Sequence, residues 1–207
     1  MLKVVVTACL LLVTQWTLGQ AQSTATVRLA SEGQARLPVV VAATAAAEVR
    51  TAADELAEYL GRIAGAEFEV LMGTPDAGIY VGVPTDFPDL PLDLEFAVQG
   101  GGPDQFVLRT TADSLFLLGT TPAAVECAVW DFLRRQGYRL FFLTDTWEVI
   151  PAQADLRVAL DVIDQPDYIT RQAPRGAPWS NRDLVHRWQK RNRMRSSFQV
   201  DTGHAYG

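Results

Sequence analysis

Side chains that build disulfides and metal sites are scarce in this sequence. Only 2 cysteines and 2 histidines occur in 207 residues. Cys9 lies inside an N-terminal leader, so the mature chain keeps Cys127 alone and has no intrachain disulfide. His186 and His204 have no acidic cluster beside them, which disfavours a zinc site. We therefore expect no metal and no cofactor, and we expect Cys127 to be a small core residue and not a nucleophile.

An apolar run long enough to cross a bilayer is also missing near the N-terminus. The stretch from Val4 to Leu18 is interrupted by polar residues and is too short to span a membrane comfortably. Lys3 precedes it, and Gly19-Gln20-Ala21 supplies small residues at the −3 and −1 positions of a cleavage site. Residues 1–21 therefore predict a secretory signal peptide. We expect a secreted or periplasmic protein with no membrane attachment after cleavage.

Positive charge is sparse except in one segment. The chain carries 18 Lys and Arg against 24 Asp and Glu, a formal net charge of −6, and loss of Lys3 makes the mature chain about −7. Between Arg171 and Arg195, however, eight basic residues occur with a single acid, Asp183. Such a run is also typical of nucleic-acid binding. In an exported chain we instead expect no nucleic acid, but a solvated helix face with a few arginines for anionic or hydroxylated ligands.

Apolar residues at helical spacing predict two amphipathic helices. The first follows Thr44, its expected N-cap, and ends at Gly65. The second has Thr121 as its cap, Pro122 in its first turn and Gly137 at its end. Both apolar stripes are one-sided, so we expect an α+β fold with both helices on one face of a mixed, mainly antiparallel sheet. Strands are expected at Leu37–Val41, Phe68–Leu71, Ile79–Val83, Phe106–Thr110, Ser114–Leu118, Tyr138–Phe142, Trp147–Ile150 and Leu156–Leu160, with shorter ones at Thr26–Leu29 and Leu94–Val98.

The apolar pattern breaks at Gln165-Pro166, which predicts a domain boundary. We assign residues 22–34 to a linker, 35–165 to the α+β domain and 166–207 to a second domain. In that second domain a strand at Tyr168–Arg171, a helix at Trp179–Met194 and a strand at Phe198–Val200 form a β-α-β unit. This unit predicts the start of a (β/α)8 barrel that is truncated at Gly207, because one such unit cannot close a barrel.

The ordered motifs of the α+β domain resemble a known family. The helix Val49–Gly65 (VRTAADELAEYLGRIAG) leads to the strand Ile79–Gly82 (IYVG). This pair resembles the N-terminal domain of family 67 α-glucuronidases and the analogous domain of family 20 β-hexosaminidases. Further matches are Leu117–Pro122 (LLGTTP), Ala128–Leu133 (AVWDFL) and Gly137–Arg139 (GYR). The chain departs from the pattern at Ala124, Cys127 and Leu140, where glycine, an aromatic residue and tryptophan are frequent.

The resemblance extends over about residues 35 to 207 and implies the N-terminal, non-catalytic part of a secreted carbohydrate-active enzyme. The parent would be a glycoside hydrolase acting on oligo- or polysaccharides. Such enzymes use two carboxyl groups across the scissile bond, and in barrels these lie at the C-terminal ends of strands. By the resemblance they would fall beyond Gly207. The acids that this chain does contain, including Asp145 and Glu148 on either side of Trp147, form no convincing catalytic pair and are expected at the surface.

Two residues are candidates for substrate binding. Arg171 ends the first expected barrel strand, and His204 follows the second. Both would then lie at the barrel mouth, where an arginine can bind a carboxylate or hydroxyls and a histidine can bind a sugar hydroxyl. The alternatives are a salt bridge between domains for Arg171 and an ordinary loop histidine for His204.

A different class of function is a carbohydrate-binding or scaffolding module of a non-enzymatic secreted protein. A row of exposed aromatic residues on the free face of the sheet would favour it. Tyr80, Phe106, Phe116 and Tyr138 alternate with other residues and are the candidates for that row. A short protein that stands alone fits the pattern badly, because it would leave apolar strand edges bare.

Overall fold

A six-stranded mixed sheet organises the computed structural model, which describes residues 24–89, 104–168, 170–171 and 181–195. The strand order is β11-β6-β7-β5-β3-β4. The strands are β3 (Val39–Val41), β4 (Val70–Met72), β5 (Ile79–Gly82), β6 (Phe106–Thr110), β7 (Leu115–Gly119) and β11 (Asp161–Asp164). Every residue of β5 and β7 is buried, so both faces of the sheet are covered at its centre.

The sheet is mixed, as expected, but the expectation that it is mainly antiparallel is wrong. Three pairings, β3 with β4, β3 with β5 and β5 with β7, are parallel. Two, β6 with β7 and β11 with β6, are antiparallel. The 18-residue helix between β3 and β4 is a crossover, and a crossover returns the chain in the same direction.

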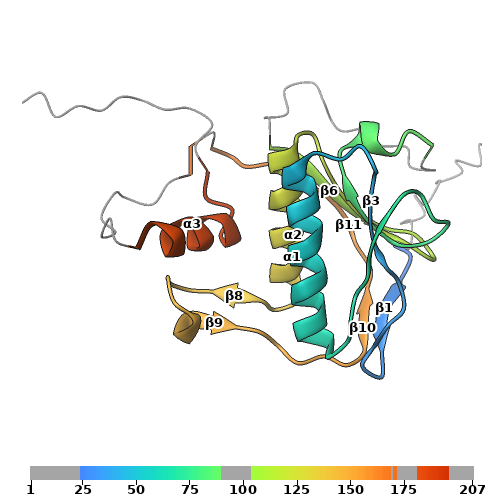
Figure 1. Cartoon of the computed structure of the whole chain (residues 1–207), viewed down its shortest axis with the longest axis horizontal. Helices are drawn as coiled ribbons and strands as arrows, with labels where there is room; N and C mark the ends of the chain where they lie inside the picture. The colour runs from blue at the N-terminus through green and yellow to red at the C-terminus, as the bar shows by residue number, and fades with distance from the viewer. Residues whose placement is uncertain (1–23, 90–103, 169, 172–180, 196–207) are drawn as a thin grey trace, which may run out of the picture.

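The two expected helices lie on one side of the sheet (Figure 1). Helix α1 spans Ala47–Ala64, and Gly65 ends it with a left-handed φ of 66°. Helix α2 spans Pro122–Arg135, and the Thr121 hydroxyl accepts a hydrogen bond from the Ala124 amide. Thr44 does not cap α1, because the helix begins later, after Ala46, which makes no side-chain cap hydrogen bond.

Large aromatic side chains form two clusters in the core. Trp130 on α2, Tyr59 on α1 and Tyr138 after α2 contact one another with ring centroids 5.0–5.4 Å apart. On β5 and β7, Tyr80 stacks on Phe116 at 5.0 Å. The candidates for a row of exposed aromatics are therefore core residues, since Tyr80, Phe106, Phe116 and Tyr138 are all at most 2% exposed.

Two smaller antiparallel sheets complete the body, the name we give to the described residues between 24 and 164. The first has the order β10-β1-β2. Its strands are β1 (Val27–Ser31), β2 (Gln34–Ala35) and β10 (Leu156–Val158). The short strand expected at Thr26–Leu29 thus corresponds to β1. The second sheet is a hairpin of β8 (Arg139–Leu140) and β9 (Glu148–Val149), with a 3-10 turn, η2 (Asp145–Trp147), at its tip. A further 3-10 turn, η1 (Pro84–Asp86), follows β5.

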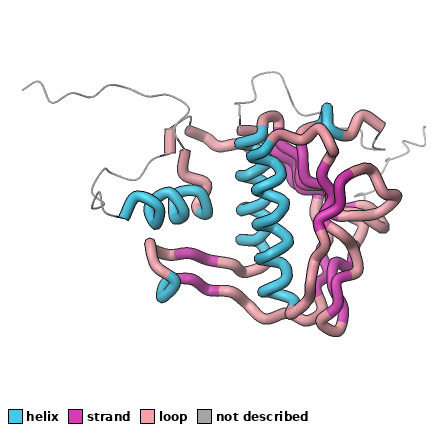
Figure 2. The backbone as a smooth tube through the Cα atoms, viewed as in Figure 1, coloured by secondary structure: helices cyan, strands magenta, loops and turns pink. Residues whose placement is uncertain are grey.

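The expected third helix is present, and the barrel is not shown. Helix α3 spans Arg182–Arg191 and lies beside the two-layer body, above the β8–β9 hairpin (Figures 1 and 2). Of the strand expected at Tyr168–Arg171, Thr170 forms an isolated bridge. The strands expected at Phe198–Val200 and Leu94–Val98 lie outside the described residues. None of the helices in the described ranges has the length and apolar character needed to span a bilayer.

Candidate functional site

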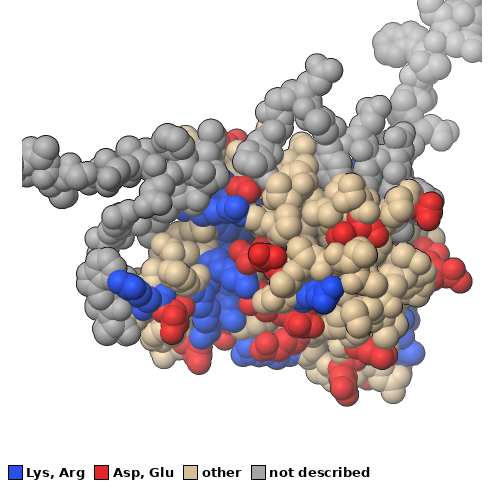
Figure 3. Space-filling model, turned by 45° about the horizontal axis from the view of Figure 1, so that its top comes forward, with Lys and Arg blue, Asp and Glu red and all other residues tan. Residues whose placement is uncertain are grey.

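The basic segment at the C-terminal end of the described chain lies against acidic side chains of the body. We call residues 181–195 the arm. The arm's basic side chains pair with carboxylates of the body. Five of these come from α1, α2, β9 and the chain before β6, and we call them the seat: Glu55, Asp104, Glu126, Asp131 and Glu148. Asp145 on η2 and Asp164 on β11 are further partners of the arm. Figure 3 shows basic side chains gathered in a band on one face of the molecule, with acidic side chains along its edges. The expectation of a solvated basic face therefore fails for most of the arm.

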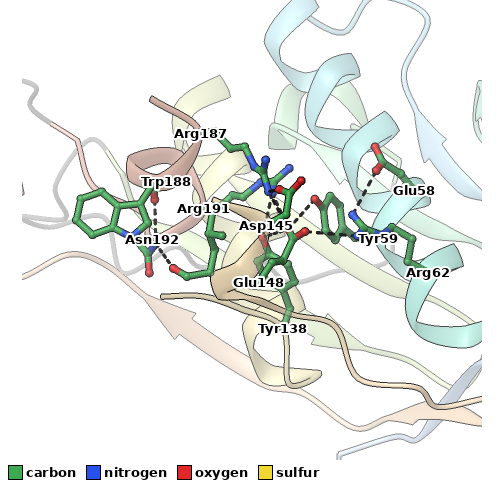
Figure 4. Close-up of polar contacts among 11 residues, drawn as sticks. Glu58, Tyr59, Arg62, Tyr138, Asp145, Glu148, Arg187, Trp188, Arg191 and Asn192 are labelled. Atoms are coloured by element: carbon green, nitrogen blue, oxygen red, sulfur yellow. Dashed lines mark hydrogen bonds and ion pairs between the residues drawn. The ribbon is translucent and has the colours of Figure 1, made fainter. Parts of the chain in front are cut away.

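Glu148 on β9 is the centre of the seat. Its Oε1 accepts hydrogen bonds from the Tyr59 hydroxyl at 3.0 Å and the Tyr138 hydroxyl at 2.8 Å. From the arm, Arg191 donates to the same oxygen at 2.7 Å, and Figure 4 shows Arg187 and Arg191 reaching toward Glu148 from α3. The Glu148 side chain is only 5% exposed. Two phenols and arginines thus enclose one buried carboxylate.

Further cations surround this carboxylate. Arg62 on α1 reaches Glu148 Oε2 at 3.4 Å, and Arg187 reaches Oε1 at 3.4 Å. Arg187 also pairs with Asp145 on η2 at 2.5 Å. The Arg191 guanidinium lies 4.8 Å from the centre of the Tyr59 ring, which adds a cation–π contact. Because Arg191 joins a carboxylate and an aromatic face, it fixes the position of α3 as well as balancing charge.

The electrostatics of this cluster favour an ionised Glu148. Burial alone would raise the pKa of its carboxyl, but the hydrogen bonds from Tyr138 and Tyr59 and the charges of Arg191 and Arg187 hold that pKa below its ordinary value. Burial, and hydrogen bonding to Glu148, raise the pKa of the Tyr138 hydroxyl. A carboxylate held ionised by arginines is a poor general acid, because it does not carry a proton near neutral pH. The cluster is suited to holding two segments together.

A second part of the seat binds Lys190. Its ammonium lies 2.8 Å from Glu55 Oε1 on α1 and 3.3 Å from Glu126 Oε2 on α2. Burial raises the pKa of Glu126, although the nearby Lys190 charge opposes the shift. Lys190 therefore bridges the two body helices. The remaining two carboxylates pair at the other end of the arm: Asp131 with Arg193 at 2.8 Å, and Asp104 with Arg195 at 3.8 Å.

A cavity of about 510 Å³ lies between the arm and the body. Its lining includes Glu55, Glu126, Cys127, Lys190, Met194 and Arg195. The Cys127 thiol is buried, and burial raises its pKa to about 11, so it is protonated at neutral pH. This agrees with the expected buried residue and not with a nucleophile. Within the described ranges, no three His, Cys, Asp or Glu side chains are grouped as metal ligands would be.

The structure places one of the two candidate substrate-binding residues. Arg171 donates from Nη2 to Asp104 at 3.0 Å and from Nε to the Arg193 carbonyl at 3.1 Å. Its backbone amide donates to the Arg195 carbonyl at 2.6 Å. These contacts match the salt bridge considered as the alternative for Arg171. His204 lies outside the described residues, so the two candidates are not brought together here.

Exposed aromatic side chains gather at the tip of the β8–β9 hairpin. Phe141, Phe142 and Trp147 are each more than half exposed. The Phe142 ring lies 6.3 Å from Trp147 and 6.2 Å from Trp188 on α3. Trp188 also donates from Nε1 to the Phe141 carbonyl at 3.2 Å. This exposed aromatic cluster therefore lies at the hairpin tip, and not on the sheet face where a row of exposed aromatics would have favoured a binding module.

Comparison with solved structures identifies the same fold in part of a glycoside hydrolase. A family GH115 4-O-methyl-α-glucuronidase with specificity for decorated arabinogalactans matches 81% of this chain with a TM-score of 0.62 and 14% identity. A GH20 β-N-acetylhexosaminidase from Streptomyces coelicolor A3(2) covers 71% of the chain at 20% identity, with a TM-score of 0.47. The expected likeness to an α-glucuronidase domain is confirmed at the level of fold, by an enzyme of family GH115 and not of family 67.

The matched region is a minor part of both enzymes. The chain spans about a quarter of the length of the two solved structures, 25% in each case. No protein-family model matches the chain. No curated protein matches it either. The fold is therefore shown, whereas activity, substrate and partners are not.

Proposed function

We propose that this chain is a non-catalytic part of a secreted carbohydrate-active enzyme, in which the α+β body holds the segment that leads into a further domain. The observation behind this proposal is that ion pairs hold the arm against the body. A region shared with about a quarter of a GH115 enzyme supports it. The catalytic carboxylates and the carbohydrate substrate would then belong to that further domain.

The proposed organisation changes one predicted boundary. Residues 1–21 would be a signal peptide and 166–207 the start of a barrel, as predicted. The accessory domain predicted at 35–165 would also include β1 from the predicted linker 22–34, because β1 pairs with β10 and its Leu29 and Ala30 are fully buried. The protein would be secreted or periplasmic. Arg171 and His204 stay predictions as sugar-binding residues, and Arg171 would have to exchange its contact with Asp104, or share it, to bind a ligand.

The first test is the intact mass of the native secreted protein, isolated from its own source. We expect a mass well above the 22.7 kDa of this chain. That protein should hydrolyse at least one member of a panel of 4-nitrophenyl glycosides that includes uronides, and the 207-residue chain should hydrolyse none. A native mass near that of residues 22–207, or hydrolysis by the chain alone, would overturn the proposal.

The exposed aromatics at the hairpin tip favour a second candidate, a carbohydrate-binding module. Aromatic faces commonly contact the apolar faces of ligands while polar groups beside them add hydrogen bonds. Affinity electrophoresis in gels that contain soluble polysaccharides tests this function. Retardation that is lost in Trp147→Ala but kept in Met72→Ala would support it, because Met72 is also exposed but lies on β4, an edge strand of the six-stranded sheet that is not part of the hairpin. Equal mobility of all three chains would exclude it for the polysaccharides used.

A further inference from the structure

The arm is attached to the body mainly through charges. Within α3, which is described along its whole length, no residue is buried. Trp188 is only partly buried where it packs against the edge of the core. The other contacts are the ion pairs of Arg187, Lys190, Arg191 and Arg193. Two neutral hydrogen bonds, from Trp188 to the Phe141 carbonyl and from Asn192 to the Leu140 carbonyl, add to them. Little apolar area therefore resists removal of the arm, since apolar burial contributes in proportion to area.

Some carboxylates of the seat also have partners within the body. Without the arm, Glu148 would keep the hydroxyls of Tyr59 and Tyr138 and the guanidinium of Arg62. Asp131 would keep Arg135, which lies 2.6 Å away on the same helix. Removing one partner of a buried pair is costly because it leaves a charge unpaired. Here that cost is reduced, because partners within the body stay in place.

The remaining seat carboxylates are accessible to water or paired elsewhere. The side chains of Glu55 and Glu126 are 24% and 36% exposed beside Lys190, so water can replace the ammonium. Asp104 pairs with Arg171, which precedes the arm. The body core is built from β1 to β10 with α1 and α2, and the arm adds only Trp188 at its margin. Loss of the arm would therefore leave the core closed.

We propose that residues 181–195 form a releasable joint: the arm leaves the seat as a unit when its ion pairs are screened, and it uncovers Cys127 while the body stays folded. This inference deepens the proposed supporting role, because the body would hold the following segment conditionally. Only the purpose of the release depends on the proposed function; the release itself does not. Release of the arm can be observed whether or not the parent protein hydrolyses a sugar.

Cys127 is a natural reporter for release, because it lies at the cavity beneath the arm. The experiment uses the full chain with Cys9→Ser, which leaves Cys127 as its single thiol. The reagent is N-ethylmaleimide, whose lack of charge keeps salt from altering its approach. Raising NaCl from about 0.05 M to about 1 M shortens the screening length from more than 10 Å to about 3 Å. We expect modification of Cys127 to accelerate by on the order of tenfold.

Matched variants distinguish the loss of the arm's own ion pairs from the loss of an ion pair elsewhere in the body. Lys190→Gln with Arg193→Gln removes the arm's pairs to Glu55, Glu126, Asp131 and Asp164. We expect this double variant to react faster at low salt and to respond less to added salt. Arg109→Gln is the control, because it removes a pair between β6 and β11, with Asp161, in which no residue of the arm takes part. Arg109→Gln should behave as the parent chain does.

Two results of the Cys127 measurement would contradict the proposed release of the arm. One is a Cys127 modification rate that neither salt nor the double variant changes. The other is acceleration that occurs only together with loss of the far-ultraviolet circular dichroism of the body, which would mean global unfolding. If the double variant itself fails to fold, then the body depends on the arm, and the proposal is also wrong. Hydrogen exchange at α3 in the unmodified sequence provides a readout without any substitution.

Discussion

Glu148 is the residue at which the body and the arm converge. Its carboxylate takes hydrogen bonds from Tyr59 and Tyr138 on one side and from Arg191 on the other, in a site that is 5% exposed. Each donor offsets part of the cost of burying a charge. The same burial makes every contact stronger than it would be at the surface.

Glu148→Gln should lower the free energy of unfolding by about 3 kcal/mol, because it removes a buried charge that Arg62 and Arg191 are placed to meet. Urea denaturation followed by circular dichroism measures the change. Asp145→Asn is the control, since Asp145 pairs with Arg187 at the exposed hairpin tip and surface pairs contribute little. If the two substitutions have equal effects, the central role of Glu148 is wrong.

The stabilisation from Glu148 should also depend on pH. Folding lowers the pKa of its carboxyl, so its contribution is complete above the unfolded value of about 4.3 and is lost as the pH falls through the folded value. The difference in unfolding free energy between the parent chain and Glu148→Gln should therefore be constant above about pH 5 and shrink below about pH 4. Glu126, whose pKa is raised, acts in the opposite direction in both chains and cancels from the difference. A difference that grows on acidification would contradict this assignment.

Sequence reasoning missed Glu148 because its partners are distant along the chain. The phenol of Tyr59 is 89 residues away, and Arg191 is 43 residues away. Beside Trp147 in a turn, Glu148 has no local pattern that separates it from an exposed acid. The one available signal was the concentration of basic residues between Arg171 and Arg195 in an otherwise acidic chain. That imbalance indicates a complementary acidic surface without locating it.

Among the elements, the two helices were easier to predict than the sheet. Their apolar periodicity and the end of α1 at Gly65 are local features of the sequence. Strand direction is not local, because a buried strand has the same pattern in parallel and antiparallel pairs. β11 was missed because Asp161 and Asp164 break its apolar pattern at both ends, yet Asp161 pairs with Arg109 on β6.

The caps of the two helices provide a test at this scale. Thr121→Ala should lower the free energy of unfolding by about 1 kcal/mol, because the Ala124 amide loses its acceptor. Thr44→Ala is the matched substitution, since Thr44 is exposed and precedes α1 without capping it. We expect no measurable effect from Thr44→Ala in the same thermal or urea denaturation. A comparable loss from Thr44→Ala would indicate that α1 begins earlier than Ala47.

For the whole molecule, stability should be unevenly distributed between body and arm. Amide hydrogen exchange followed by mass spectrometry should show α1, α2 and β7 exchanging slowly, because their residues form the buried core. Amides of α3 should exchange at least on the order of 100-fold faster, because its few buried contacts permit local opening. Equal protection of α3 and α2 would show that the two open together, as one cooperative unit.

The meeting of Arg171 and Arg195 has a consequence for how the chain continues. The Arg171 amide donates to the Arg195 carbonyl, and Asp104 pairs with both side chains. Arg171 and Arg195 are therefore held side by side next to β6, at one carboxylate of the body. None of these contacts uses a residue of α3. Replacing α3 should therefore leave the pairing of Arg171 with Arg195 in place.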